Sequence, residues 1–318
     1  MNKQLQFELW EQCNSLCKFC YLGTENRFTP DHLKIQACEK ALEKISDLSL
    51  YPEYDTLSYL GGEFFQGQMS NPEVKKAFMN LMKKTAGLLK EGIVSHVWIY
   101  ATLTIGDQKD LYETLDLFEG HKGELWVLTS YDTLGRFHTP KMEENWSYHM
   151  KNIHKLYPEI LFNITTILSE DCIDKYLSGE LSFKKMMEEY HTSFFFKQCG
   201  ASNITLQEMN KRLPGFVPPR KKFLQFLKKF RAEESPMMWD KLFNIKYRAD
   251  TLYRNGNSED TSMQLNTRHK DSNAEVELDH VSSETELAEC GHLKNYHAYS
   301  DCDGCVICDK QMIEKMMS

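Results

Sequence analysis

The stretch KQLQFELWEQCNSLCKFC, residues 3–20, sets an alternating apolar and polar run directly before three closely spaced cysteines. The alternation predicts a β-strand over residues 3–10, and the cysteine loop begins where this strand ends. Cys13, Cys17 and Cys20 cannot all pair with one another, and an exposed free thiol is reactive unless something uses it. The spacing therefore predicts a bound group in a loop at the carboxyl end of the first strand.

Strands and helices alternate through the first two thirds of the chain. Such alternation predicts a parallel sheet with helical crossovers, and in these sheets functional residues gather at the carboxyl ends of the strands. The second strand runs into Gly61-Gly62-Glu63, so this turn and the cysteine loop are expected at one edge. The predicted strands cover residues 3–10, 54–60, 95–104, 123–132, 160–168 and 192–200. The predicted helices cover 30–48, 71–92, 107–119 and 144–158, with one or two further helices over 172–190.

The pattern changes after residue 205, which divides the chain into a domain over 1–205 and a C-terminal extension over 206–318. Residues 220–234 predict a basic amphipathic helix. Its charges form either a solvated face over an apolar stripe or a docking surface for an acidic peptide or a nucleic-acid backbone. Residues 255–286 are polar and predict a weak β-hairpin or a loop.

Composition bounds the class of protein. The 318 residues include 41% hydrophobic residues and carry a net charge of −8, which argues against a general nucleic-acid coat protein. The N-terminal residues offer no apolar run long enough for a signal peptide or a membrane span, so we expect a cytoplasmic protein. In that reducing compartment ten cysteines favour metal ligands and core positions over disulfides. Seven of the ten lie in two clusters, at residues 13–20 and 290–308. The other three are expected in the core: Cys38, Cys172 and Cys199. Substrate could also reach Cys199.

The chemistry of the first cysteine cluster favours iron over zinc. A zinc site would need a fourth ligand, and the neighbouring sequence has no other His or Cys. Three thiolates suit three corners of a [4Fe-4S] cluster and leave one iron open for a chelating substrate or cofactor. Buried structural cysteines are the alternative interpretation.

The spacing Cys13-x3-Cys17-x-Phe19-Cys20 resembles the cluster motif of the radical S-adenosylmethionine (radical SAM) superfamily. The resemblance covers residues 1 to about 205 and implies an α/β fold, a partial (β/α)6 TIM-like barrel. It also implies two cofactors, a [4Fe-4S] cluster and S-adenosylmethionine (SAM). A smaller cysteine-rich metal-binding region follows at the C-terminus.

Further site residues follow from the same resemblance. The turn of Gly61, Gly62 and Glu63 would hold the SAM amino group, with Phe64 where the family often has proline. Phe19 would shield the cluster or pack near the adenine, or is simply a buried loop aromatic. A Ser-x-Asp pair with a downstream arginine would lie near the SAM ribose and carboxylate, although an ordinary cap and turn is the alternative: Ser130, Asp132 and Arg136.

The implied reaction begins when SAM chelates the open iron. An electron donor of flavodoxin or ferredoxin type supplies one electron, the C–S bond breaks, and a 5′-deoxyadenosyl radical takes a hydrogen atom from the substrate. The cofactors carry the difficult chemistry, and the protein orients them and excludes competing reactions.

A second cysteine cluster lies near the C-terminus. It predicts a closed metal site, either a second [4Fe-4S] cluster or Zn²⁺. His292 is an alternative zinc ligand, and His297 lies nearby. The arrangement loosely resembles the auxiliary SPASM and twitch domains of peptide-modifying radical SAM enzymes. The four expected ligands are Cys290, Cys302, Cys305 and Cys308.

Three functions compete. The first is a radical SAM enzyme that modifies a peptide or protein side chain, which the second cluster and the polar C-terminal region favour. The second is a radical SAM enzyme that acts on a nucleotide, RNA or a small metabolite. The acidic net charge disfavours a large RNA substrate but not a nucleotide. The third is a metal-stabilised binding module without turnover. The substrate and the catalytic acid or base are not predicted by the sequence, and no membrane partner is expected.

Overall fold

The computed structural model describes residues 3–20, 28–50, 54–197, 213–216, 218–235, 238, 251–254 and 257–259. Within these ranges the structure describes only the backbone of some residues. They are 251–254, 257–259, Lys3, Phe195, Lys197 and Arg220. Several predictions therefore concern residues outside the described ones and stay predictions. They are Cys199, His292, His297, the hairpin around residues 260–286, and the ligands Cys290, Cys302, Cys305 and Cys308.

The protein has an α/β fold built on one sheet, whose strand order is β6-β5-β4-β3-β2-β1-β7-β8. The first six strands are parallel, and sheet neighbours are also neighbours in the chain, which confirms the six predicted strands. In the described residues β6 and β8 are the two edges, so the sheet is open and does not close into a barrel. The six strands are β1 (Lys3–Glu8), β2 (Tyr54–Leu60), β3 (His96–Tyr100), β4 (Glu124–Ser130), β5 (Leu161–Ile167) and β6 (Thr192–Lys197).

Two short strands from the C-terminal half extend the sheet beyond β1. The strand β7 (Thr251–Arg254) pairs in parallel with β1, and β8 (Asn257–Glu259) pairs antiparallel to β7. The sheet therefore contains residues from both sides of the predicted division at residue 205, which itself stays a prediction.

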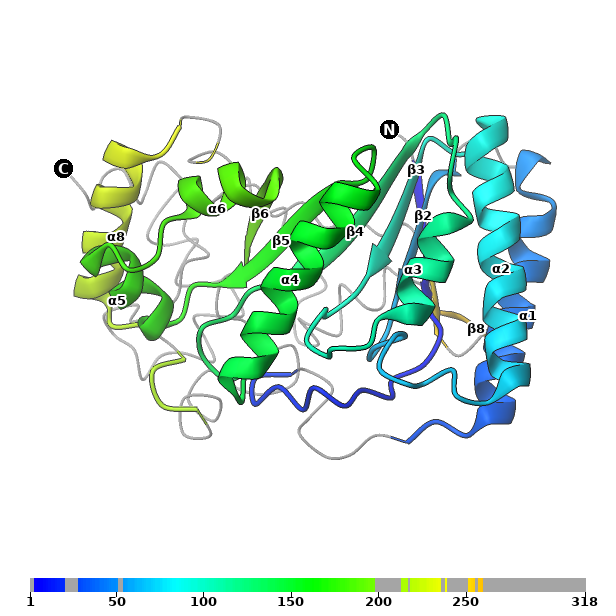
Figure 1. Ribbon diagram of the computed structural model, residues 1–318, viewed down its shortest axis with the longest axis horizontal. Coiled ribbons are helices and arrows are strands. Elements are labelled where there is room, and N and C mark those ends of the chain that lie inside the picture. Colours follow the sequence, from blue (N-terminus) through cyan, green and yellow to red (C-terminus); the bar gives the residue numbers. More distant parts are fainter. Residues whose placement is uncertain are drawn as a thin grey trace, which may run out of the picture.

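Helices form the crossovers between the parallel strands, and Figure 1 shows α2, α3 and α4 on the near side of the sheet. Their ends follow local chemistry. Asn71 caps α2 by accepting a hydrogen bond from the Glu73 N–H (2.9 Å), and Gly92 ends the helix at φ 76°. The α-helices of the described residues are α1 (Asp31–Ser46), α2 (Pro72–Glu91), α3 (Lys109–Asp116), α4 (Pro140–Leu156), α5 (Glu170–Ser178), α6 (Phe183–Tyr190) and α8 (Arg220–Glu233).

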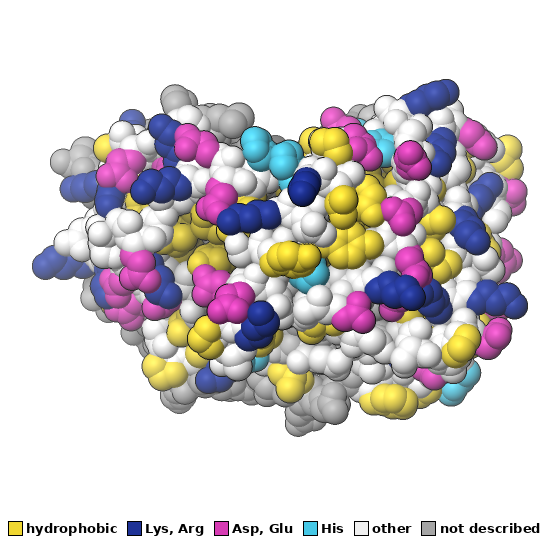
Figure 2. Space-filling view, in the orientation of Figure 1, with side chains coloured by type: hydrophobic (Ala, Val, Ile, Leu, Met, Phe, Trp, Pro, Cys, Tyr) yellow, Lys and Arg dark blue, Asp and Glu magenta, His cyan; other side chains and the backbone are white. Residues whose placement is uncertain are grey.

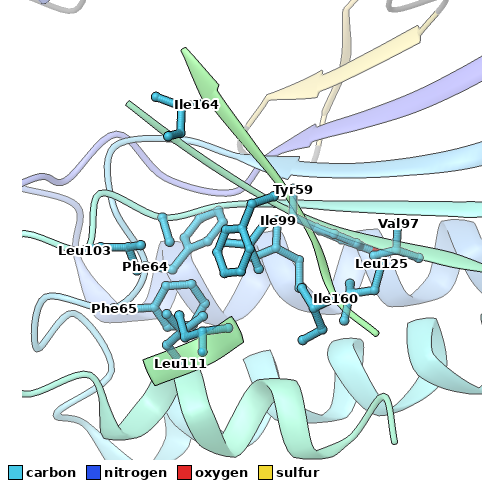
Figure 3. Packing of buried hydrophobic residues seen from close by; sticks show 14 of the residues in the cluster. Tyr59, Phe64, Phe65, Val97, Ile99, Leu103, Leu111, Leu125, Ile160 and Ile164 are labelled. Atoms are coloured by element: carbon cyan, nitrogen blue, oxygen red, sulfur yellow. The ribbon is translucent and has the colours of Figure 1, made fainter. Parts of the chain in front are cut away.

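The main core lies between the sheet and these helices (Figure 3). Alternate strand residues such as Tyr59, Val97 and Ile99 are fully buried on the helical side, as the period of two in a strand requires. The Tyr59 hydroxyl is 2.6 Å from the Thr85 hydroxyl of α2, which fixes this side as the helical one. Cys38 and Cys172 are fully buried, which confirms their prediction as core residues.

The basic helix α8 is part of this core. Its apolar stripe, which includes Phe226 and Phe230, packs against Tyr176 of α5. Lys222 pairs with Glu170 and Asp174 of α5 at 2.5 and 2.9 Å, so part of the basic charge is neutralised within the protein. These contacts favour the predicted solvated face over an apolar stripe, and α8 serves as a packing helix for the end of the sheet.

Charges of both signs are interspersed over the helical face of the molecule (Figure 2). Among the described helices, none is both long enough and apolar enough to span a bilayer.

Candidate functional site

The cysteine loop and the Gly-Gly-Glu turn lie against each other at the carboxyl ends of β1 and β2. The Gly62 N–H donates to the Trp10 carbonyl (2.8 Å), and the Glu63 N–H donates to the Gln12 carbonyl (2.9 Å). The Trp10 indole N–H returns a hydrogen bond to the Glu63 carbonyl (3.2 Å). The structure therefore brings together the two motifs that the sequence predicted at one edge of the sheet.

Glycine is required in this turn because the two backbones approach so closely. A Cβ on Gly61 would lie 2.3 Å from the Trp10 carbonyl oxygen, and a Cβ on Gly62 would lie 2.2 Å from that of Gln12. Both distances are far below van der Waals contact. The observed role of the two glycines is thus to let the cysteine loop dock on the turn.

The Glu63 carboxylate is buried, with 3% of the residue exposed. One oxygen accepts from the Phe65 N–H (3.0 Å) and the other from the Thr102 N–H (2.6 Å). Burial raises the pKa of this carboxyl, although the backbone hydrogen bonds oppose the shift. A cationic group beside Glu63 would stabilise the charged form, which is what an amine-binding carboxylate needs.

Gln66 links the cysteine loop to the two following loops, and sequence reasoning missed it. Its side-chain oxygen accepts from the Asn14 N–H (2.9 Å), and its amide nitrogen donates to the Ser15 hydroxyl (2.7 Å). The same nitrogen lies 3.0 Å from the hydroxyl of Thr102 and 3.2 Å from that of Thr104, in the loop after β3. Only a three-dimensional arrangement reveals this role, since an isolated glutamine carries no motif.

The three thiols of the loop lie close enough to affect one another. Burial raises the pKa of Cys13, and the charges of Glu63 and Cys20 add to the rise. Burial likewise raises the pKa of Cys17 to about 11, although the Arg136 cation opposes it. The raised pKa values keep the thiols of Cys13 and Cys17 protonated when unbound, and a bound metal would hold them as thiolates.

Arg136, which is partly buried, forms an ion pair with the buried Asp132 beside the cysteine loop. The Arg136 Nε lies 2.6 Å from an Asp132 carboxylate oxygen, and the other oxygen accepts from the Ile167 N–H (2.8 Å). The guanidinium stands 5.4 Å from the centre of the Phe19 ring, which also stacks on Phe216 at 6.1 Å. The structure therefore brings Asp132, Arg136 and Phe19 to the cysteines.

Ser130, the remaining residue of this predicted group, is the last residue of β4. It pairs in register with Thr165 of β5 and is half-buried. The loop that follows β4 is tied to the cysteine loop by two further contacts. The Lys18 N–H donates to the Gly135 carbonyl (3.1 Å), and the His138 Nε2 lies 2.7 Å from the Ser15 carbonyl. His138 is a second residue of the site that sequence reasoning missed.

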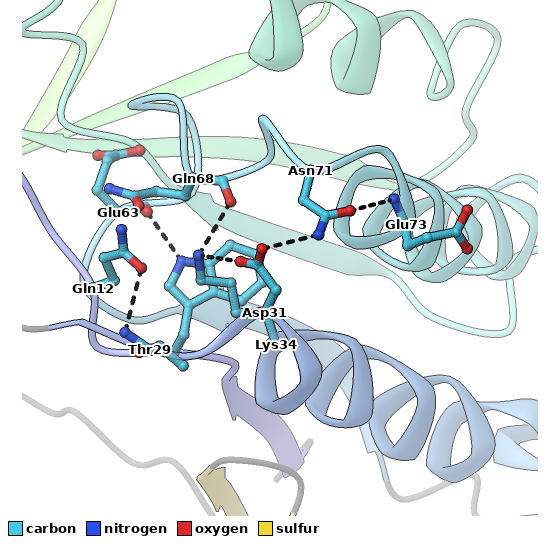
Figure 4. Close-up of polar contacts among 9 residues, drawn as sticks. Gln12, Thr29, Asp31, Lys34, Glu63, Gln68, Asn71 and Glu73 are labelled. Carbon is cyan, nitrogen blue, oxygen red and sulfur yellow. Dashed lines mark hydrogen bonds and ion pairs between the residues drawn. The ribbon is translucent and has the colours of Figure 1, made fainter.

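A polar cluster holds the first two helices beside the turn (Figure 4). The buried Lys34 ammonium lies 3.2 Å from an Asp31 carboxylate oxygen and 3.3 Å from the Gln68 carbonyl. Asn71, the cap of α2, donates to the other Asp31 oxygen (2.9 Å). These contacts fix the loop that follows Glu63 relative to α1 and α2.

The donor set fits an iron-sulfur cluster in its chemistry. Three thiol sulfurs from one loop interact electrostatically, and the partly buried Arg136 guanidinium stands beside them to offset negative charge. As the side chains are placed, no three His, Cys, Asp or Glu residues in the described ranges are grouped closely enough to hold a metal ion. Cluster binding would therefore draw the three sulfurs together.

No family model matches the chain, and none of the curated proteins matches it either.

Proposed function

We propose that the chain is a radical SAM enzyme whose six-stranded sheet and crossover helices form the partial (β/α)6 barrel of that superfamily. One observation carries the proposal. Three thiols and the buried Glu63 carboxylate converge where β1 and β2 end, and the cysteine spacing is that of the superfamily motif. The consecutive parallel strand order supports it, because this topology puts both motifs at one edge.

The residues of the chain would divide the work as follows. Cys13, Cys17 and Cys20 would hold a [4Fe-4S] cluster, which when bound supplies the electron that cleaves SAM into methionine and a 5′-deoxyadenosyl radical. The Glu63 carboxylate would accept the SAM amino group, and its burial would strengthen that ion pair by excluding water. Arg136 would offset the negative charge of the thiolates.

The substrate in this proposal is a peptide or protein side chain, with a nucleotide or small metabolite as the alternative. A flavodoxin- or ferredoxin-type partner would deliver the electron. The C-terminal cysteines would bind a second [4Fe-4S] cluster or Zn²⁺, as their spacing predicts.

Anaerobic reconstitution with iron and sulfide tests this function. Wild-type protein with dithionite and SAM should release 5′-deoxyadenosine, and Cys17→Ala should release none because it leaves two thiols for the cluster. Cys38→Ala is the control, since Cys38 is a fully buried cysteine in α1. Equal yields from wild type and Cys17→Ala, or no yield from iron-loaded wild type, would refute the proposal.

A further inference from the structure

Three non-glycine residues in the described ranges have a positive φ, and two of them lie in loops of the proposed site. Leu16, between Cys13 and Cys17, has φ 46°, and Leu103, in the loop after β3, has φ 59°. Residues other than glycine rarely adopt this region, and such a conformation persists only where the surroundings fix it. Leu16 is 38% exposed, so the packing of its own side chain contributes little to holding it. Groups outside the two leucines therefore hold both loops in place.

Gln66 contacts the residue directly before each of these leucines. Its amide nitrogen lies 2.7 Å from the Ser15 hydroxyl and 3.0 Å from the Thr102 hydroxyl. Ser15 and Thr102 are the residues that directly precede the two leucines in the sequence. Gln66 is buried, so water competes little for these hydrogen bonds. One side chain thus joins the two turns that have a positive φ.

The contact of Gln66 with the cysteine loop extends over two residues. The Gln66 side-chain oxygen accepts from the Asn14 N–H (2.9 Å), and the Gln66 carbonyl accepts from the Asn14 side-chain amide (3.1 Å). Ser15 is buried, its N–H donates to the Cys13 sulfur (3.4 Å), and its carbonyl lies 2.7 Å from the His138 Nε2. The chain that follows Cys13 is therefore fixed by hydrogen bonds of the protein itself.

The same glutamine contacts the residue that orients Glu63. Thr102 donates its N–H to one Glu63 carboxylate oxygen (2.6 Å), while the Thr102 hydroxyl meets the Gln66 amide. The other carboxylate oxygen accepts from the N–H of Phe65, the residue before Gln66 (3.0 Å). A movement of the cysteine loop would thus pass through Gln66 and Thr102 to the carboxylate. Two sites that share such a link change each other's binding by the same factor, because coupling is reciprocal.

This position uses both the acceptor and the donor of an amide side chain. The Asn14 N–H needs an acceptor, and the Gln66 amide nitrogen supplies two N–H groups to the neighbouring hydroxyls. Methionine has a similar length and neither group, so it would leave the Asn14 N–H without its acceptor. Gln68, two residues further on, offers a comparison, because it is also buried and its side-chain nitrogen has no hydrogen-bond partner in the described part of the protein.

We infer that Gln66 is a positioning residue that holds the cysteine loop ready for the cluster and, through Thr102, couples cluster binding to SAM binding at Glu63. The inference rests on the proposed function, since Gln66 joins the two halves of that site. Without the side-chain bonds of Gln66, the turn at Leu16 is free to relax, and cluster binding has to order the loop again. Both the hold on the iron and the effect of SAM on that hold should therefore weaken.

Hydrogen exchange tests the hold on the loop and needs no iron. Amide exchange is measured by mass spectrometry over residues 10–20 of the full-length protein before reconstitution. Exchange should be about fivefold faster in Gln66→Met than in wild type, because the Asn14 N–H loses its acceptor. Gln68→Met is the matched control and should exchange as wild type does. Equal exchange in Gln66→Met and wild type overturns the inference.

Iron release tests the coupling. Each protein is a full-length chain that also carries Cys302→Ala/Cys305→Ala, so that the first cysteine cluster alone supplies iron. After reconstitution, release to a ferrous chelator is timed without SAM and with saturating SAM, which should slow it because a ligand of the assembled form stabilises that form.

In Gln66→Met, release without SAM should be about fivefold faster than in wild type. The protection ratio, which is the rate without SAM divided by the rate with SAM, should fall about threefold. Gln68→Met should match wild type in both. A general loss of stability would speed both rates alike and leave the protection ratio unchanged, and that result overturns the inference.

Thr102→Val tests the route to Glu63. This variant keeps the N–H that Glu63 accepts and loses the hydroxyl that meets Gln66. It should lower the protection ratio about twofold and leave exchange over residues 10–20 at the wild-type rate. A wild-type protection ratio in Thr102→Val overturns the inference, and this variant decides the question if Gln66→Met does not fold.

The same measurements distinguish this inference from the proposed function. If SAM slows iron release equally in wild type and Gln66→Met, the inference alone is overturned. If wild type takes up no iron, or if SAM leaves its iron release unchanged, the proposed function is overturned and the coupling falls with it.

Discussion

At the scale of single residues, the site depends on how closely two loops can approach. Gly61 and Gly62 have no side chain, and the backbone of residues 10–12 occupies the space where a Cβ would stand. This contact puts Cys13 near Glu63, whose charge contributes to the raised pKa of that thiol. The sequence motif therefore has a mechanical basis in addition to any role in binding a cofactor.

Adding one methyl group tests this mechanical role. Gly62→Ala should destabilise the protein by about 1–3 kcal/mol, because the new Cβ would force the Gln12 backbone away. Gly87→Ala is the control, since Gly87 lies within α2 with open space around it and alanine there should stabilise by about 0.5–1 kcal/mol. Urea unfolding midpoints measure both changes, and a Gly62→Ala protein as stable as wild type would contradict the prediction.

Residues with a spaced motif could be located from the sequence, and residues without one could not. The cysteines and the Gly-Gly-Glu turn were predicted at one edge because each follows a strand, and the structure joins the turn to Trp10 and Gln12, directly before Cys13. Gln66 and His138 were missed, since their partners at Ser15 come from a loop far away in the sequence. Arg136 contacts Asp132 and Phe19, and its expected place near SAM stays a prediction.

At the scale of elements, periodicity located all six parallel strands and the helices of the described residues, and the differences in their bounds have physical causes. The stretch 172–190, predicted as one or two helices, forms two, because Gly179 ends α5 before α6 begins. The helix predicted over residues 144–158 begins earlier, at Pro140, because proline suits the first helical position, where no N–H partner is needed. The pairing of β7 with β1 was not predicted, since no local pattern tells a short strand which edge it will join.

A chain of hydrogen bonds fixes α3 and α4 to the loop after β3. The buried His149 has its Nε2 2.9 Å from the Ile105 carbonyl, and its Nδ1 is 3.0 Å from the Tyr112 hydroxyl. Asn152 donates to that same hydroxyl at 2.9 Å. Because a carbonyl only accepts, Nε2 carries the proton, and Nδ1 accepts from Tyr112 in the neutral imidazole.

This arrangement predicts a dependence of stability on pH. Burial lowers the pKa of His149 below its usual 6.5. As the pH falls below 6.5, His149 is therefore protonated in the unfolded chain before it is protonated in the folded protein. The stabilisation from His149 should be complete above pH 6.5. It should decline as the pH falls from 6.5 toward the lowered pKa of His149 in the folded protein. His149→Gln should be less stable than wild type by about 1 kcal/mol at neutral pH, and this gap should narrow in acid. Urea midpoints across the range measure it, and a constant gap would contradict the prediction.

At the scale of the whole molecule, the sheet unites the two halves of the sequence. The helix α8 packs on α5 at one end, and β7 extends the other end beside β1. The predicted site lies at the carboxyl ends of β1 and β2. The strand β1 pairs on one side with β2, from the N-terminal half, and on the other with β7, from the C-terminal half. This arrangement gives the C-terminal half a direct structural link to the strand that precedes the cysteine loop.

The metal content of the whole protein tests whether the C-terminal half also carries a metal site. Four cysteines at 290–308 predict one closed site besides that of Cys13, Cys17 and Cys20. If both hold [4Fe-4S] clusters, reconstituted wild type should contain about eight irons, and a Cys302→Ala/Cys305→Ala variant about four. If the second site holds zinc, wild type should contain about four irons and about one zinc, and the variant should lose only the zinc. Cys172→Ala is the control, since its buried thiol belongs to the core and should leave both metals in place. A double variant with wild-type iron and zinc would exclude the second site, because two remaining cysteines cannot close it.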